Sequence, residues 1–378
     1  MTQPDPDAHP HADPVADPAP DARPASPATA RGRRRAVFAG LALLLSLGLA
    51  AVVGEVALRI LDLDVPARRY FSPGIYRADP DLGWALLPGY RGVHREYSYD
   101  ARTSTNARGF RGPEWDAARR AAPVRVLCLG DSCTFGRGVN DGEEFTARLE
   151  VALRARLGRE VSVYAAAVPG YDTVQEDVLH AQLQAELAPQ VVVVAWLPND
   201  VLERSVETRK QQQVIDGQLV RDAARYKAWK YKIEGRGLYR SALYRFLRLH
   251  LTRLTHEQGN SNYKGDLSDL AYSQEPLARI HERARAAGAR LVVALFPRVE
   301  EISGAAGTGH HEAMRAWCAA RGIAVVDFPA RWRGRIGVWG PRYIEGDSVH
   351  FTAAGYEAIA QELAAEPVWA EVAPGGGG

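Results

Sequence analysis

Two copies of the triplet Gly-Asp-Ser hold the residues best suited to chemistry in this sequence, Ser132 in the first copy and Ser348 in the second. The second copy also places Asp347 three residues before His350, a spacing at which the two side chains can meet across one turn. An aspartate bonded to one imidazole nitrogen fixes the tautomer and leaves the other nitrogen free to act as a base. We therefore predict that the second triplet supplies an acid, Asp347, and a base, His350, while Ser348 points elsewhere.

The first triplet follows a short apolar run directly, so Ser132 is expected on a strand-to-helix turn. A serine there can project its hydroxyl beyond the end of the strand, where parallel sheets bind their ligands. Serine is a poor nucleophile at neutral pH unless a base lies within hydrogen-bond distance and a third group orients that base. We predict that Ser132 is the nucleophile and that His350 and Asp347 are its partners.

Donors for the oxyanion of a tetrahedral intermediate are expected after two further apolar runs. Residues 161–167 are followed by "VPGYDT", in which Gly170 lets a backbone N–H approach closely. Residues 190–197 end at "PND", which offers the side-chain amide of Asn199. With the N–H of Ser132, these groups make three donors at one edge of a sheet.

The same residues also have plain structural interpretations. Ser132 and Asp347 could each serve only as a helix cap, and His350 could be a core histidine. Asp131 and Asp200 neighbour the predicted site and rival Asp347 as the orienting acid. We interpret both as structural residues that hold loops through hydrogen bonds to backbone N–H groups.

The elements that must position these residues alternate between strands and helices. Apolar runs typical of buried strands occupy residues 124–130, 161–167, 190–197, 289–296 and 323–328. Amphipathic stretches typical of helices, such as residues 143–158 and 173–188, separate them. Nearly continuous hydrophobic strands between helices indicate a parallel sheet that is covered on both faces.

An apolar stretch near the N-terminus is typical of a membrane anchor. Residues 36–54 hold no charged residue, and these 19 residues would span about 28 Å as a helix, close to the hydrocarbon thickness of a bilayer. Arginines at positions 31, 33, 34 and 35 precede the stretch and favour a cytoplasmic N-terminus. We therefore expect a single-pass membrane protein whose main domain is extracytoplasmic, either periplasmic or at the cell surface. A cleaved signal peptide and a buried core helix are the alternatives; the former normally has a shorter apolar core and leader.

Composition divides the remainder of the chain. Residues 1–35 are rich in Pro, Ala and Asp and are expected to be a disordered cytoplasmic tail. Residues 55–122 are interpreted as a linker and irregular collar, with Arg108 and Arg111 in surface turns; a binding role for these two arginines is the alternative. Residues 123–370 form the predicted α/β domain, followed by a flexible tail at 371–378.

A basic insertion at about 203–275 interrupts the α/β rhythm, because it is far longer than a crossover needs. Its aromatic residues recur at helical spacing. One interpretation is amphipathic helices packed on the sheet, and the other is a lid or a face for anionic lipid headgroups or polysaccharide.

Overall charge and cysteine content exclude several classes of function. The formal net charge of +2 gives no argument for a nucleic-acid partner. Cys128, Cys133 and Cys318 are too scattered for a disulfide framework or a zinc site and are expected to be small buried thiols. His310 and His311 have no further ligands at useful spacing and are interpreted as the start of a surface helix. We expect no cofactor and no metal.

The four short motifs resemble those of the SGNH, or GDSL, hydrolase family. "GDSCTFG" is similar to the block around that family's nucleophile, "VPGYDT" to its glycine block, "PND" to its asparagine block and "DSVH" to its Asp-x-x-His block. The motifs occur in the family's order, and the resemblance covers about residues 123 to 368. The chain departs from the family at Ala165 and Leu197, which could reshape the pocket but remove no reacting group, and at Cys133, the residue after the serine.

The resemblance implies a flavodoxin-like three-layer α/β/α sandwich around a parallel sheet of about five strands, here preceded by one transmembrane helix. It implies that Ser132 is the nucleophile, that Asp347 and His350 are acid and base, and that Ser132, Gly170 and Asn199 form the oxyanion hole.

The expected activity is that of a serine esterase acting on short acyl esters of a carbohydrate or lipid. Two alternatives stay open. One is an acyltransferase that moves acyl groups onto cell-surface polysaccharide beside a multispanning acyl-donor membrane protein. The other is a catalytically silent carbohydrate- or lipid-binding module.

Overall fold

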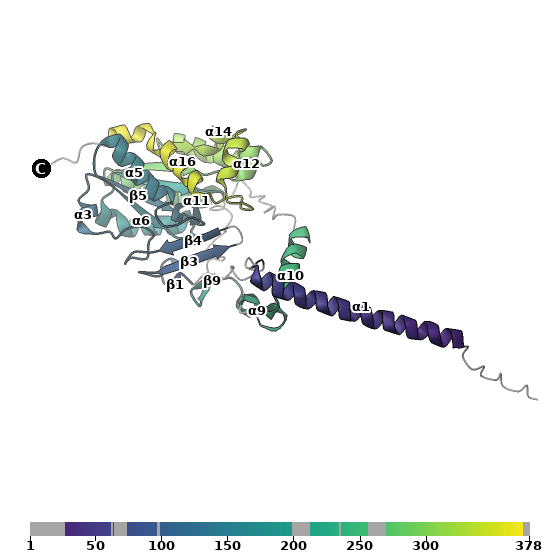
Figure 1. Ribbon diagram of the computed structural model, residues 1–378. Coiled ribbons are helices and arrows are strands. Elements are labelled where there is room, and N and C mark those ends of the chain that lie inside the picture. Colours follow the sequence, from purple (N-terminus) through teal and green to yellow (C-terminus); the bar gives the residue numbers. More distant parts are fainter. Residues whose placement is uncertain are drawn as a thin grey trace, which may run out of the picture. The chain divides into compact units, whose positions relative to one another are not determined.

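The computed structural model describes residues 27–61, 63, 74–96, 99–198, 212–233, 236–255 and 270–372. The chain divides into two compact units, Met1–Ile60 and Leu61–Gly378. The first unit holds one described element, and the second holds the sheet and all other elements (Figure 1).

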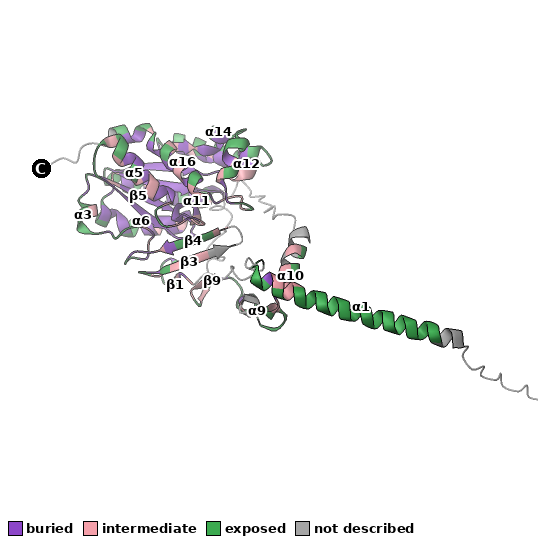
Figure 2. Ribbon diagram, in the orientation of Figure 1, coloured by how far each residue is buried: buried purple, intermediate pink, exposed green. Residues whose placement is uncertain are grey.

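Helix α1, Pro27–Ile60, is the described part of the first unit. By length and composition it is the one helix among the described residues that could cross a bilayer, from Arg31 to Ile60. Its side chains are exposed along most of its length, as Figure 2 shows. The apolar stretch 36–54 lies inside this helix, which begins within the segment expected to be a tail.

A five-stranded parallel sheet forms the centre of the second unit. Its order is β11-β10-β7-β5-β6, and every neighbouring pair is parallel. The strands are β5 (Val124–Gly130), β6 (Val161–Ala167), β7 (Val191–Trp196), β10 (Arg290–Leu295) and β11 (Ala324–Asp327). All five predicted strands are therefore present.

Helices cover both faces of this sheet (Figure 1). Alternate residues of a strand point to opposite faces, so Val126 and Cys128 pack in one core, and Leu127 and Leu129 pack in the other. The first core includes α5 (Phe145–Leu157) and α16 (Ala353–Ala364); the second includes α6 (Thr173–Leu187), α11 (Ala271–Ala286) and α13 (Gly309–Ala319). The predicted three-layer α/β/α arrangement is confirmed.

The segment expected to be an irregular collar contains two antiparallel hairpins. They pair β1 (Tyr76–Asp79) with β2 (Gly83–Leu86) and β3 (Arg91–Glu96) with β4 (Tyr99–Ser104). In the first turn the Asp79 carboxylate accepts the N–H groups of Asp81 and Leu82, and Gly83 takes a φ of 82°. Such short strands lack the long apolar runs that reveal the central sheet.

The described part of the basic insertion contains a hairpin as well as helices. Strands β8 (Gln213–Ile215) and β9 (Gln218–Val220) pair across a turn in which Asp216 and Gly217 both have positive φ. This geometry matches a tight two-residue hairpin turn. Helices α9 (Ala223–Ile233), η1 (Gly237–Arg240) and α10 (Ala242–Thr255) follow.

Short elements complete the described fold. They are α3 (Ala117–Arg120), α4 (Ser132–Phe135), α12 (Val299–Ser303), α14 (Phe328–Trp332), α15 (Ile336–Trp339), η3 (Gly340–Arg342) and η4 (Pro367–Glu371).

Candidate active site

Ser132 is the first residue of helix α4, directly beyond the carboxyl end of strand β5, which lies between β7 and β6 in the sheet. Asp131 caps this short helix, because its carboxylate accepts the N–H of Cys133 at 2.8 Å. Gly130 is required for close packing, since a Cβ there would lie 2.1 Å from the Thr134 hydroxyl oxygen. These contacts fix the position of Ser132 at the edge where parallel sheets bind ligands.

Asp347 and His350 lie on a tight loop before helix α16. The loop is closed by hydrogen bonds from the N–H of Asp347 to the carbonyl of Ile344 and from the N–H of Ile344 to the carbonyl of His350. One carboxylate oxygen of Asp347 accepts the N–H groups of Val349 and His350, at 2.8 and 3.0 Å. The other oxygen lies 2.7 Å from Nδ1 of His350. The predicted contact across one turn is present.

The electrostatics of the loop favour a charged Asp347. Burial alone would raise the pKa of Asp347, but the hydrogen bond and the charge of His350, with the two backbone donors, lower it to about 2. A carboxylate can only accept, so Nδ1 of His350 carries the proton in this contact. Nε2 is then left as an acceptor on the opposite side of the ring.

The Nε2 atom of His350 lies 2.7 Å from the Ser132 hydroxyl oxygen, across 218 residues of sequence. Ser132, His350 and Asp347 thus form one continuous chain of hydrogen bonds. The Ser132 hydroxyl can donate to Nε2, which is the geometry that a general base needs in order to remove a proton. The structure brings these three predicted side chains together, while their catalytic roles stay predictions.

Ser348 points away from this chain of hydrogen bonds. Its hydroxyl accepts a hydrogen bond from Arg298, and its carbonyl accepts the N–H of Val299 at the start of α12. Asp347 therefore contacts His350, while the adjacent Ser348 contacts Arg298 and Val299. Asp131, the rival acid, has the capping role that we expected of it, and Asp200 lies outside the described residues.

Gly170 lies on the turn that follows β6 and has a φ of 87°. The loop is tied to the start of the Ser132 turn, because the N–H of Val168 donates to the carbonyl of Gly130 at 3.2 Å. The N–H groups of Gly170 and Ser132 donate to no described residue. Trp84 and Leu219 border the space next to Gly170, at 3.5 and 3.7 Å from where a Cβ would stand. Asn199, the third predicted donor, lies outside the described residues.

Arg111 supports the loop after Ser132, a role that the sequence analysis missed because we expected this residue in a surface turn. Its side chain is only 1% exposed. Its guanidinium donates to the carbonyls of Phe135, the last residue of α4, and of Gly136 and Val139 in the loop that follows. It also pairs with Asp141 and Glu144. Arg111 therefore fastens the collar to the loop behind Ser132. The turn "NARGFRG" gave no signal of burial, since glycine-rich turns are usually exposed.

Cys133 makes a second connection between the two halves of the site. Its thiol is fully buried and lies 3.6 Å from the carbonyl of Val349, the residue before His350. The three cysteines are buried, as predicted, and this one packs directly behind the contact between Ser132 and His350.

A buried carboxylic acid, Glu176, lies close enough to Asp131 for their charges to interact. Glu176 is fully buried in the first turn of α6, and its carboxyl oxygens bond to no described residue. Burial raises the pKa of Glu176 well above its usual value, and the negative charges of Asp131 and Asp172 raise it further. This environment favours the protonated form, which adds no second negative charge beside the Asp131 cap.

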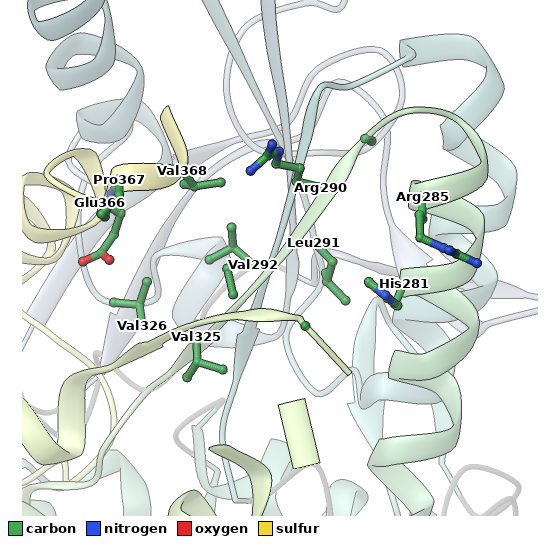
Figure 3. A pocket seen from close by; sticks show the side chains of 13 residues that line it. His281, Arg285, Arg290, Leu291, Val292, Val325, Val326, Glu366, Pro367 and Val368 are labelled. Atoms are coloured by element: carbon green, nitrogen blue, oxygen red, sulfur yellow. The ribbon is translucent and has the colours of Figure 1, made fainter. Parts of the chain in front are cut away.

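The one cavity shown in close-up lies at the opposite edge of the sheet. It measures about 410 Å³ and is lined by the first residues of β10 and β11, by α11 and by residues 366–368 (Figure 3). It is remote from Ser132 by topology, because it opens at the amino ends of strands whose carboxyl ends face the site. Among the described residues no group of three or more His, Cys, Asp or Glu side chains could hold a metal ion.

The chain is similar to a known family and to several solved structures. The GDSL-like lipase/acylhydrolase family matches residues 128–358. No curated protein matches the chain.

Three solved structures of similar fold are described by their sequence identity, coverage and TM-score. A lipase from a goat rumen metagenome is 18% identical, covering 64% of this chain and 95% of that one with a TM-score of 0.40. A lipase/acylhydrolase from Enterococcus faecalis is 15% identical, covering 66% and 98% with a TM-score of 0.38. The structure of TesA is 18% identical, covering 63% and 95% with a TM-score of 0.39.

Proposed function

Because the chain belongs to the GDSL-like lipase/acylhydrolase family, we propose that it is a serine esterase that hydrolyses short acyl esters through an acyl-enzyme on Ser132. One observation carries the proposal. His350 lies 2.7 Å from the Ser132 hydroxyl on one side of its ring and 2.7 Å from the Asp347 carboxylate on the other.

Acylation uses His350 first as a base and then as an acid. The Ser132 oxygen attacks the ester carbonyl carbon while its proton passes to Nε2 of His350. The Asp347 carboxylate stabilises the imidazolium that forms. When the tetrahedral intermediate collapses, His350 returns the proton to the departing alcohol oxygen, and the acyl group stays on Ser132.

The oxyanion receives its hydrogen bonds from two backbone N–H groups and one side-chain amide. The N–H groups of Ser132 and Gly170, which donate to no described residue, bind the developing negative charge, and the Asn199 amide is the third donor. A water molecule then attacks the acyl-enzyme, His350 takes its proton, and the second tetrahedral intermediate releases the acid and free Ser132.

The esterase domain is tethered to a membrane by α1. Support comes from the length and apolar composition of Arg31–Ile60 and from the arginines that precede its apolar part. The positive-inside rule places the N-terminus in the cytoplasm and the catalytic domain outside it, facing ester-bearing carbohydrate or lipid.

The test is ester turnover by the full chain in detergent, together with labelling by a fluorophosphonate probe. We expect p-nitrophenyl acetate hydrolysis that Ser132→Ala and His350→Ala each lower by about 10⁵- to 10⁶-fold in kcat. Ser348→Ala, the same substitution in the other Gly-Asp-Ser triplet, is the matched control and should keep its turnover.

Two results would contradict the proposal. Failure of the probe to label Ser132, with no turnover in the wild type, would indicate a silent binding module. Diversion of the acetyl group from water to an added oligosaccharide would indicate an acyltransferase that shares only the first half of the mechanism.

A further inference from the structure

The segment 221–255 concentrates positive charge to an unusual degree. It contains ten Lys or Arg residues and two Asp or Glu residues, a net charge of +8. Since the whole chain carries +2, the rest of the protein carries −6. The charge is therefore local to this segment, whose described helices α9, η1 and α10 we call the basic helical surface.

Exposed leucines accompany this charge. Leu247 and Leu251 lie one turn apart on α10 and are 50% and 60% exposed, and Leu238 in η1 is 70% exposed. Residues four apart share one face of a helix. Arg248, three residues before Leu251, is also exposed, so cationic and apolar side chains lie side by side on α10. Of the described side chains of α9 and α10, only Tyr226 and Ala242 are buried.

A hollow between β9 and α9 adds a concave feature to the surface. It measures about 390 Å³, and its lining includes the apolar Leu219 and Val220 beside Arg221 and Arg225. Asp222 also lines it, but its carboxylate caps α9 by accepting two backbone N–H groups. A lipid phosphate in this hollow would lie beside guanidinium groups, and the lipid's hydrocarbon part would contact apolar side chains.

The basic helical surface is tied to the rest of its unit at Asp216. This carboxylate bonds to the Tyr226 hydroxyl at 3.1 Å and to the Lys230 ammonium group at 2.5 Å. The neighbouring Gly217 accepts the N–H of Tyr76 at 2.9 Å, which links the β8–β9 hairpin to β1. The basic helical surface is therefore connected, through the β8–β9 hairpin, to Leu219, which borders the space next to Gly170.

We propose that the basic helical surface docks on an anionic phospholipid membrane, with Leu247 and Leu251 in the headgroup boundary and the arginines on lipid phosphates. The inference rests on the proposed anchor α1 and is independent of the esterase reaction. Thirteen residues separate the end of α1 at Ile60 from Gly74, so this connection reaches at most about 45 Å. A spanning α1 would hold the domain within that reach of a bilayer.

The mixture of side chains favours a lipid surface over a soluble polyanion. Amphipathic helices with cationic and apolar faces bind in the plane of the membrane interface. A polyanionic glycan would be satisfied by the charges alone and would leave the leucines in water.

The test places a fluorescent reporter on α10 of the full chain reconstituted in vesicles. The three native cysteines are fully buried, so Leu247→Cys can be labelled selectively with the NBD fluorophore. We expect a blue shift and a severalfold loss of iodide quenching when phosphatidylglycerol is added to phosphatidylcholine. Val151→Cys on α5, 63% exposed, is the matched reporter and should show neither change.

Charge variants separate docking from general adhesion. Arg225→Gln with Arg248→Gln should weaken docking roughly 30-fold, the equivalent of about 2 kcal/mol at about 1 kcal/mol for each cation near an anionic surface. Arg285→Gln with Arg290→Gln, at the opposite edge of the sheet, should leave docking unchanged.

Equal quenching of the position-247 label in both lipid mixtures would overturn the inference, and so would a chain that does not float with vesicles, since its premise is a spanning α1. One further result would assign the surface to a soluble polyanion instead. In it, dextran sulfate protects the position-247 label from iodide quenching in neutral vesicles, while anionic vesicles alone give no protection. Turnover of a soluble ester in the same vesicles reports on Ser132 separately.

Discussion

Replacing Arg111 by methionine tests whether the collar is part of the catalytic domain. The substitution keeps most of the side-chain volume but removes the donors to three buried carbonyls, those of Phe135, Gly136 and Val139, and the cation beside Glu144. Glu144 is itself buried, and burial raises its pKa while the charge of Arg111 lowers it. Without Arg111 the loop behind Ser132 keeps several unpaired polar groups.

The expected loss of stability is large. Breaking a buried ion pair by removing one partner costs about 3–5 kcal/mol, and a buried carbonyl left without a donor costs about 1–3 kcal/mol. These contributions overlap because the loop can relax and admit water, so we expect a loss of about 4–5 kcal/mol in the free energy of unfolding. Against the roughly 5–15 kcal/mol of an ordinary domain, such a loss is severe.

The matched control is Arg108→Met, three residues away in the same turn. Arg108 is 40% exposed and pairs with Glu186 at the surface, and its guanidinium lies 5.4 Å from the Trp115 ring. An exposed pair contributes about 0–1 kcal/mol and an exposed cation–π contact about 0.5–1 kcal/mol. Urea unfolding followed by tryptophan fluorescence, with ester turnover, measures both variants. Losses that agree within about 1 kcal/mol would refute the argument from burial.

Three further predictions test single contacts. Asp347→Asn should keep the fold but favour the wrong tautomer of His350, lowering kcat by about 10⁴-fold; a kcat within tenfold of wild type would contradict this. Gly130→Ala places a Cβ 2.1 Å from the Thr134 hydroxyl oxygen and should cost about 1–3 kcal/mol together with much of the turnover. Gly307→Ala, at a glycine without a positive φ where a Cβ meets no atom within 4 Å, should keep its turnover, and equal turnover in both would count against the packing argument. Burial lowers the pKa of His180 to about 4, so the folded state binds fewer protons than the unfolded state between that value and about 6.5, and stability is lost as pH falls through this window, by up to about 3 kcal/mol. Urea midpoints measured across the window should fall less steeply in His180→Asn; an unchanged slope would contradict the assignment.

The central sheet could be predicted because its signal is local and redundant. Residues 124–130 and 161–167 are apolar without interruption, and the observed β5 and β6 have these same bounds. The contact between Asp347 and His350 was predictable for a similar reason, since both lie on one turn. The approach of Ser132 to His350 needed more, namely that the ends of parallel strands share one edge.

The collar and the insertion hairpin could not be predicted in the same way. Strands of three to six residues are too short for a distinctive apolar run, and their pairing depends on distant contacts such as Tyr76 with Gly217. The expectation that the collar is irregular was therefore wrong. The prediction that Arg111 lies in a surface turn was wrong for the same physical reason. Arg111 is buried against Glu144, which lies 33 residues further along the chain.

These distant contacts also decide where the catalytic unit begins. The family match starts at residue 128, and the predicted α/β domain starts at residue 123. A chain shortened to residue 123 would lose Arg111 and leave Glu144 buried without its cation. It would also lose Trp84, whose indole packs beside Gly170 and donates to the carbonyl of Pro169. We therefore expect a chain starting at residue 123 to be insoluble or inactive while one starting at residue 74 hydrolyses esters, and equal activity of the two would show that the sheet alone positions Ser132.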